Sequence, residues 1–176
     1  MKEIKGTETE KNLLIAFSGE SQARNKYTFF ASQAKKEGFI NISKIILEIA
    51  DNEKEHAKIL FKYLNGLSNT VSNIENAVKG ENFEWSDMYK KFATVAKNEG
   101  FEEISKKFEQ IADIEKSHEK KFLELLSEIK NNKVFSYDNE VAWVCANCGH
   151  IHFGKTAPEI CPVCEHSKSY FKKERS

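Results

Sequence analysis

Two segments of this 176-residue chain repeat one another at a constant offset of 62 residues. Residues 27–64 and 89–126 share 19 identities over 38 aligned positions, without a gap. A repeat of this length is long enough to hold the end of one helix, a turn and most of a second helix. The sequence therefore predicts an internally duplicated helical domain, in which whatever one half binds the other half binds as well.

Each copy of the repeat contains a Glu-x-x-His motif, with Glu53 and His56 in the first copy and Glu115 and His118 in the second. A spacing of three residues places both side chains on one face of a helix. One such motif alone is equally compatible with a solvated helix surface. Two copies at matched positions, with glutamates from two further helices, instead indicate two metal ions bound between the halves.

Hydrophobic periodicity and turn residues predict four long helices. Thr7 and Glu10 fit a capping box at the first helix start, and Asn41 is a candidate cap for the second. The polar residues 66–80 are expected to form a long connection. A short turn, a long crossover and a short turn describe an all-α, ferritin-like four-helix bundle. The expected helices cover about residues 7–36, 41–65, 82–98 and 102–130.

Carboxylates interrupt the apolar stripe that each predicted helix should turn toward the core. Glu20, Glu53, Glu84 and Glu115 each lie 15–18 residues from the nearest glycine turn, which is about 22–27 Å along a helix. They are therefore expected at one level of the bundle. Buried glutamates need compensating cations, and Arg24 is the one inward cation we identify. Two iron ions would supply that charge, and manganese or zinc would also accept such ligands.

The third helix departs from the repeat. The offset of 62 aligns Glu20 with Asn82, whereas the available carboxylates are Glu81 and Glu84, one helical turn apart. The second half thus offers one more carboxylate than the first, and a spare ligand could permit ligand exchange during turnover. Either glutamate could instead be an ordinary exposed residue near a helix start, where the helix dipole favours it.

All four cysteines fall in the tail, as Cys145-x-x-Cys148 and Cys161-x-x-Cys164. Two such pairs give four thiolates in a tetrahedron, which suits either a structural zinc or a one-electron iron centre. The spacing does not decide between the two metals. Because four sulfurs complete the tetrahedron, three nearby histidines are expected to lie at the surface. These are His150, His152 and His166.

A segment so short needs a metal as well as a small core to fold. Residues 131–140 lose the helical period and are expected to link this segment to the helices. The aromatic residues expected in its core are Trp143, Phe153, Tyr170 and Phe171.

Composition excludes other classes of protein. The 27 basic and 27 acidic residues balance, so the chain lacks the basic footprint of a nucleic-acid-binding protein. No apolar run approaches the ~20 residues that span a bilayer, and the N-terminus has no apolar signal region. We therefore expect a cytoplasmic protein with neither nucleic acid nor membrane as a partner.

With these motifs in this order, the chain resembles the rubrerythrin family over nearly its whole length. The matching features are Glu20, the two Glu-x-x-His motifs, Glu81-x-x-Glu84, and a tail with Cys-Gly before the gap and Ala-Pro-x-x-Cys-Pro after it. The resemblance implies a ferritin-like di-iron domain over residues 1–136 and a rubredoxin-like Fe(Cys)4 domain over residues 140–176.

The resemblance also implies an activity, namely reduction of hydrogen peroxide to water as protection against oxidative stress. Electrons would come from reduced pyridine nucleotide through rubredoxin or an NAD(P)H-dependent rubredoxin reductase, enter the Fe(Cys)4 centre and pass to the di-iron site. The family is usually a homodimer in which one tail approaches the partner's di-iron site. Two alternatives are an iron-oxidising, iron-storing ferritin-like protein and a zinc-loaded structural protein.

By the same resemblance, Glu53 and Glu115 would bridge the two irons, and Glu20 and Glu81 would be terminal ligands. His118 would bind one of the irons.

The other iron would exchange Glu84 for His56 as its oxidation state changes. Tyr27 and Tyr89, paired in the repeat, match family tyrosines that form hydrogen bonds near the site. These four residues are the expected catalytic set.

Overall fold

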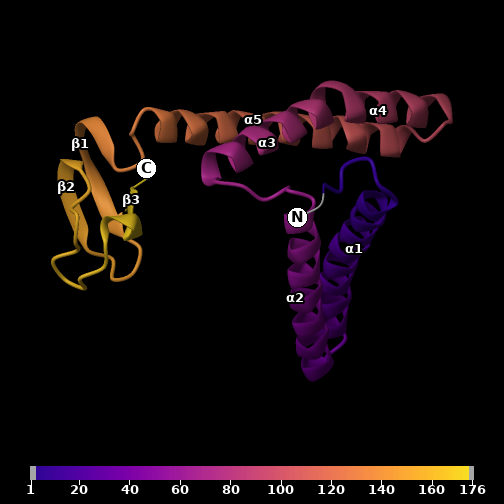
Figure 1. Ribbon diagram of the computed structural model, residues 1–176, viewed down its shortest axis with the longest axis horizontal. Coiled ribbons are helices and arrows are strands. Elements are labelled where there is room, and N and C mark those ends of the chain that lie inside the picture. The colour runs from indigo at the N-terminus through magenta and orange to yellow at the C-terminus, as the bar shows by residue number, and fades with distance from the viewer. Residues whose placement is uncertain (1–2, 175–176) are drawn as a thin grey trace. The chain divides into compact units, whose positions relative to one another are not determined.

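The computed structural model describes residues 3–174 (Figure 1). The chain divides into two compact units, the first ending at Ser68 and the second beginning at Asn69, and each is described by itself. The elements are α1 (Glu8–Lys36), α2 (Ile40–Tyr63), α3 (Thr70–Phe83), the π-helix η1 (Glu84–Met88), α4 (Tyr89–Asn98), α5 (Glu102–Lys130), β1 (Ser136–Cys145), β2 (Ile151–Thr156), the 3-10 helix η2 (Lys168–Tyr170) and β3 (Phe171–Lys173).

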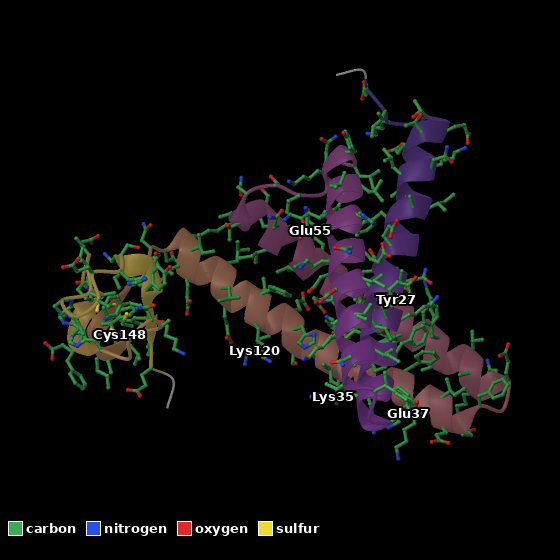
Figure 2. The ribbon with its side chains drawn as sticks, turned by 90° about the horizontal axis from the view of Figure 1, so that it is seen from below. Tyr27, Lys35, Glu37, Glu55, Lys120 and Cys148 are labelled. Atoms are coloured by element: carbon green, nitrogen blue, oxygen red, sulfur yellow. The ribbon has the colours of Figure 1, made fainter. Side chains whose placement is uncertain are left out.

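The first unit is an antiparallel hairpin of α1 and α2. Thr7 caps α1 as predicted, because its side chain accepts a hydrogen bond of 3.2 Å from the Glu10 backbone N–H. The Glu10 carboxylate accepts from the Gly6 N–H at 2.6 Å instead of reaching back to Thr7. The other end of the hairpin carries charged side chains, among them Lys35 and Glu37 (Figure 2).

Gly38 makes the turn of this hairpin with a φ of +88°, a conformation that favours glycine. The helix α2 begins after Phe39 without a side-chain cap, so the prediction that Asn41 caps it is wrong. Across the hairpin the Ser43 hydroxyl donates to the Ala31 carbonyl at 2.8 Å. Both residues are buried, and their small side chains let the two backbones approach closely.

The second unit begins with a helix where we expected a connection. Residues 66–80 do not form one long loop, because α3 starts directly after Asn69. The Asn69 side chain accepts a hydrogen bond of 3.0 Å from the Ser72 N–H and caps the helix. The many Asn and Ser residues of this segment favoured a connection, although it also contains a short apolar stripe at helical spacing. That stripe consists of Val71, Ile74 and Val78.

The hairpin of α4 and α5 repeats the first one. The Ser105 hydroxyl donates to the Ala93 carbonyl at 2.8 Å, which is the Ser43–Ala31 contact displaced by 62 residues. Gly100 makes the turn with a φ of +85°, as Gly38 does in the first hairpin. The predicted duplication is therefore present in the packing as well as in the sequence.

The tail forms a three-stranded antiparallel sheet in the order β2-β1-β3. Because β1 begins at Ser136, the second half of the predicted linker 131–140 is strand instead. Division of the chain into domains at residues 136 and 140 stays a prediction. None of the helices within residues 3–174 is long and apolar enough to cross a membrane.

The core of this sheet module is small and contains metal-binding residues. Trp143 and Phe171 are buried in it, as predicted, together with Cys145, Ala157 and Cys161. The predictions for two other aromatic residues are wrong, since Phe153 is 72% exposed and Tyr170 is 43% exposed. In β2 alternate side chains face opposite sides of the sheet, and Phe153 lies on the open side.

Candidate metal centres

The first hairpin brings three predicted ligands together. Glu20 comes from α1, and Glu53 and His56 come from α2, with one ligand atom from each lying within 4.8 Å of the others. His56 Nδ1 is 2.9 Å from a Glu53 oxygen and 3.8 Å from a Glu20 oxygen. One imidazole nitrogen therefore faces two carboxylates, which is an arrangement that a metal ion can occupy.

The second unit contains the equivalent triad, with Glu81 from α3 and with Glu115 and His118 from α5, again with ligand atoms within 4.8 Å. His118 Nδ1 lies 2.6 Å from a Glu115 oxygen and 3.6 Å from a Glu81 oxygen. The order of the two distances is the same as in the first hairpin. The duplicated motif thus produces two matching sets of ligand types.

The π-helix explains why Glu81 rather than Asn82 takes the place of Glu20. Tyr89 follows Glu81 by eight positions, whereas Tyr27 follows Glu20 by seven. The backbone absorbs the additional residue in η1, where the Tyr89 N–H donates to the Glu84 carbonyl five residues earlier. The sequence carried this signal as a change of the repeat offset from 62 to 61, but we did not predict a π-helix from it.

Glu84 is the first residue of the π-helix and is not one of the three ligand candidates of the second triad. Its charge nevertheless reaches that triad. It contributes to raising the pKa of Glu81 and, after burial, is the largest influence that raises the pKa of Tyr89. The structure therefore places the predicted spare carboxylate next to three metal-ligand candidates without including it among them.

Both triads fit a cation. The pKa of Glu20 is raised, first by its hydrogen bond with Glu53 and then by burial. The pKa of Glu81 is raised by burial first and then by its hydrogen bond with Glu115. Paired carboxylates that face one another retain a proton unless a positive charge replaces it. Two carboxylates and one imidazole per triad suit iron or manganese and do not exclude zinc.

The two predicted tyrosines differ in their surroundings. Tyr89 packs against the Phe108 ring at 5.9 Å, and burial followed by the charges of Glu84 and Glu115 raises its pKa. Tyr27 packs against the Phe30 ring at 6.2 Å. Within residues 3–174 the structure shows no hydrogen bond from Tyr27 to the first triad, so a role for it there stays a prediction.

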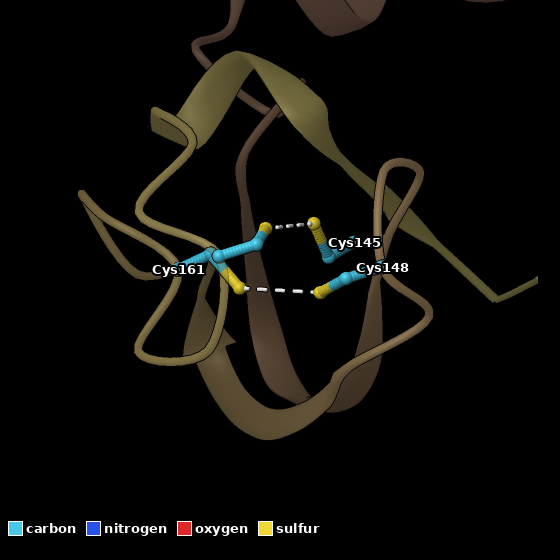
Figure 3. Close-up of side chains that lie close together, drawn as sticks. Cys145, Cys148 and Cys161 are labelled. Atoms are coloured by element: carbon cyan, nitrogen blue, oxygen red, sulfur yellow. Dashed lines mark hydrogen bonds between the residues drawn. The ribbon is translucent and has the colours of Figure 1, made fainter.

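The four cysteines of the tail converge on one point (Figure 3). The sulfurs of Cys145 and Cys164 are 3.7 Å apart, as are those of Cys148 and Cys161. Sulfurs bound at ~2.3 Å around one tetrahedral ion lie ~3.8 Å from one another. The thiols are free and their spacing is much longer than a disulfide, so the group fits a four-thiolate metal site.

Two matching turns hold these sulfurs. The Cys145 N–H donates to the His150 carbonyl at 2.9 Å, and the Cys161 N–H donates to the His166 carbonyl at 2.8 Å. The backbone N–H groups of the same histidines also donate to cysteine sulfurs, His150 to Cys148 and His166 to Cys164. The N–H of His166 is the main reason that the pKa of Cys164 is lowered, to about 6.

The thiol of Cys148 behaves in the opposite way. The His150 N–H lowers its pKa, but Cys164, burial and the remaining two thiols outweigh that effect and raise the pKa to about 12. One thiol of the group ionises readily, and its negative charge then opposes the ionisation of another thiol. A cation at the centre would relieve this repulsion, and the donor set therefore fits a metal ion.

The tail histidines are not among the four ligand candidates, but the prediction that they lie at the surface is wrong. His150, His152 and His166 are all half-buried. His166 Nδ1 lies 3.0 Å from the Cys164 carbonyl oxygen, and that hydrogen bond is the main cause of its raised pKa. Its ring also packs edge-on against Tyr170 at 4.3 Å.

Comparison with known proteins gives one consistent result. The chain matches the family model described as Rubrerythrin over residues 11–126 and again over 72–144, and the model described as Rubrerythrin, rubredoxin-like domain over residues 143–172. These matches, together with the helices and strands of the structure, confirm the predicted fold class. It is a helical ferritin-like bundle followed by a small four-cysteine rubredoxin-like domain. The residues of a di-iron carboxylate site and of a four-cysteine iron site are present, as predicted.

Full-length relatives agree with the family models. The chain is 47% identical to a rubrerythrin of Porphyromonas gingivalis over 97% of its own length and 92% of the relative's. It is 48% identical to rubrerythrin-1 of Clostridium acetobutylicum and 47% identical to a rubrerythrin of Nitratidesulfovibrio vulgaris, in both cases over 97% of this chain and 96% of the relative.

Proposed function

This chain belongs to the rubrerythrin family, and from that premise we propose that it is an oxidoreductase that reduces hydrogen peroxide to water. Each turnover would take one peroxide, two electrons and two protons and release two water molecules. The electrons would enter at the four-cysteine iron site and leave from the di-iron carboxylate site. The function would be protection of the cell from peroxide.

One observation supports this proposal more than any other. Among residues 3–174, the second of the two Glu-Glu-His triads has an additional carboxylate next to it, Glu84, in a π-helix, and the first has no such residue in a π-helix. A protein that only holds two metal ions needs no such asymmetry. A centre whose ligands must change with oxidation state does, because ferrous and ferric ions differ in charge and in the ligands that they prefer.

The side chains are assigned as follows. Glu53 and Glu115 would bridge the two ions, and Glu20 and Glu81 would be terminal ligands. His118 would bind one ion throughout.

At the other ion, Glu84 and His56 would alternate as ligands. When bound, the iron pair would supply two electrons and Lewis acidity at adjacent positions. Tyr89 would remain protonated at neutral pH, since its pKa is raised, and its hydroxyl could donate a hydrogen bond into the site. We assign Tyr27 the same role in the first hairpin.

The partners follow from the same proposal. Rubredoxin or an NAD(P)H-dependent rubredoxin reductase would supply electrons, and the protein would act as a homodimer or higher homo-oligomer. A cytoplasmic location would suit four cysteines that must stay reduced to bind a metal.

The test separates the two metal centres. Cys161→Ser should abolish peroxide reduction driven by NADH and a rubredoxin reductase system, while the helices still load two irons per chain. Val163→Ser is the matched control, because Val163 is 66% exposed in the same cysteine loop. Full donor-driven activity in Cys161→Ser would contradict electron entry through the tail. Retention of many irons per chain would instead support the ferritin-like alternative.

A further inference from the structure

A hydrogen-bonded bracket spans the start of the π-helix. The Trp85 indole N–H donates to one oxygen of Glu119 at 2.6 Å, and the Asn82 amide donates to the other oxygen at 3.0 Å. Glu119 lies on α5, directly after His118. Both oxygens of one carboxylate are thus occupied by donors from the neighbouring helix, and Glu84 lies between those two donors in the chain.

Two lysines flank the tryptophan of this bracket. The ammonium of Lys116, from α5, lies 5.1 Å from the Trp85 ring centroid, and that of Lys90, from α4, lies 5.3 Å from it. Cations at this distance are attracted to the ring. The indole therefore interacts with three residues from two helices, α4 and α5.

The first hairpin serves as an internal control. Its residue equivalent to Glu119 is Ala57, which is 8% exposed and offers no side-chain hydrogen bond. With the offset of 61 that relates Glu20 to Glu81, the residue equivalent to Asn82 is Ser21, whose hydroxyl donates within its own helix to Phe17. In this half the helix α1 runs from Glu8 to Lys36 without a π-helix.

The bracket therefore occurs in the half with the inserted residue and is missing, within the described part of the chain, from the half without it. A π-helix is rare and occurs mostly as a single turn within an α-helix. Unusual backbone of this kind persists where the surrounding structure fixes it. The contacts to Glu119 provide such a hold on both sides of Glu84.

We propose that Glu119 is a positioning residue, which fixes the π-helix through Trp85 and Asn82 and thereby sets where the Glu84 carboxylate lies beside the second triad. This inference rests on the proposed function for its kinetic consequence, but its structural part does not. Glu119 itself contacts neither substrate nor metal in this proposal.

Three variants test it. Glu119→Ala copies the first hairpin and removes both acceptors, whereas Glu119→Gln keeps a carbonyl oxygen for one donor. Trp85→Phe keeps a ring but removes the N–H. Glu109→Ala is the matched control, because Glu109 is an exposed glutamate of α5 without a hydrogen bond or ion pair within residues 3–174.

The first readout is amide hydrogen exchange of residues 84–88 in the metal-free protein. We expect Glu119→Ala to accelerate it about tenfold, since loss of a hydrogen bond to a charged group shifts a local equilibrium by that order. Glu119→Gln should restore part of the protection. Exchange in Glu119→Ala equal to that in Glu109→Ala would overturn the proposal.

The second readout is the d–d absorption of Co²⁺ bound to the helical sites, together with peroxide kinetics of the iron-loaded protein. In Glu119→Ala we expect an altered Co²⁺ band shape and a kcat lower by about tenfold, with KM unchanged. An unaltered band and an unaltered kcat would overturn the role in positioning Glu84. If the wild type proved inactive on peroxide while exchange and Co²⁺ spectra responded, the proposed function would fail and the positioning role would stand.

Discussion

Glu20 and Glu81 occupy equivalent places in the two triads although their positions in the chain differ by 61, one fewer than the repeat offset. Each lies under 4 Å from the Nδ1 of the histidine of its own triad, at 3.8 Å for His56 and 3.6 Å for His118. The π-helix after Glu81 absorbs the difference. The additional residue is thus accommodated with the ligand in place, and Glu84 begins the π-helix that accommodates it.

If Glu84 is needed for turnover and not for metal binding, its substitution should lower kcat without lowering the iron content. We expect Glu84→Gln to bind two irons per chain as tightly as the wild type, because the triad of Glu81, Glu115 and His118 is intact. Its kcat for peroxide should fall roughly 10- to 100-fold, the usual range for loss of a group that supports a metal site. Iron analysis and steady-state kinetics measure the two quantities.

The matched control for this variant is Glu99→Gln, an exposed glutamate just after α4. It should leave both quantities unchanged. Loss of one iron from Glu84→Gln, with residual activity proportional to iron content, would mean that Glu84 is a permanent ligand instead.

Stability of the metal-free protein should depend on pH through the two terminal glutamates. The pKa values of Glu20 and Glu81 are raised above 4.5 in the folded chain. Their contribution to stability is thus fully present below pH 4.5 and is lost as the pH rises through the raised pKa. Because a bound metal displaces these protons, the gain in Tm on adding Co²⁺ should grow with pH. Thermal unfolding between pH 4.5 and 8 measures it.

The double variant Glu20→Gln, Glu81→Gln should remove most of that pH dependence. A metal-induced gain in Tm that is the same at every pH in the wild type would show that the carboxylates are already ionised without metal.

The four-cysteine site should react unevenly when it is empty. Cys164 has a pKa of about 6 and Cys148 one of about 12, so at pH 7 the thiolate is on Cys164. Since iodoacetamide attacks thiolates, we expect Cys164 to be alkylated first in the reduced, metal-free protein, with a rate that rises through about pH 6. Peptide mass spectrometry identifies the modified residue.

Loading the site with Zn²⁺ should protect all four cysteines from the reagent. Faster modification of Cys148, which is the more exposed of the two, would mean that access rather than ionisation governs the reaction.

Much of the fold and of the metal centres could be predicted from the sequence, because each feature of the duplicated segment appears in two copies that must agree. The Ser43–Ala31 contact recurs as Ser105–Ala93, and each Glu-x-x-His motif forms its triad. The predictions that failed concern segments where the side chains of single residues determine the structure more than hydrophobic periodicity does. The helix over residues 70–83 was missed because its Asn and Ser side chains, together with the cap Asn69 just before it, are typical of a connection.

Other features could not be inferred from spacing alone. Phe153 is exposed because strand alternation, set by the position of Trp143 in the neighbouring strand, turns it outward. The contact between Trp85 and Glu119 joins residues 34 apart that no motif connects. Such contacts depend on how two helices pack side by side, and the repeat offers no counterpart for comparison.

In the proposed function the two iron centres work together as one peroxidase. The most direct test is to reduce the iron-loaded protein fully without oxygen and add two equivalents of hydrogen peroxide per chain, which demand more electrons than the iron pair alone holds. The visible thiolate-to-iron absorption of the four-cysteine centre is then followed by stopped flow. We predict rapid return of that absorption as peroxide is consumed, because electrons leave the tail for the helical site. Peroxide consumption with no return of the absorption would contradict the account, since the two centres would then not be connected.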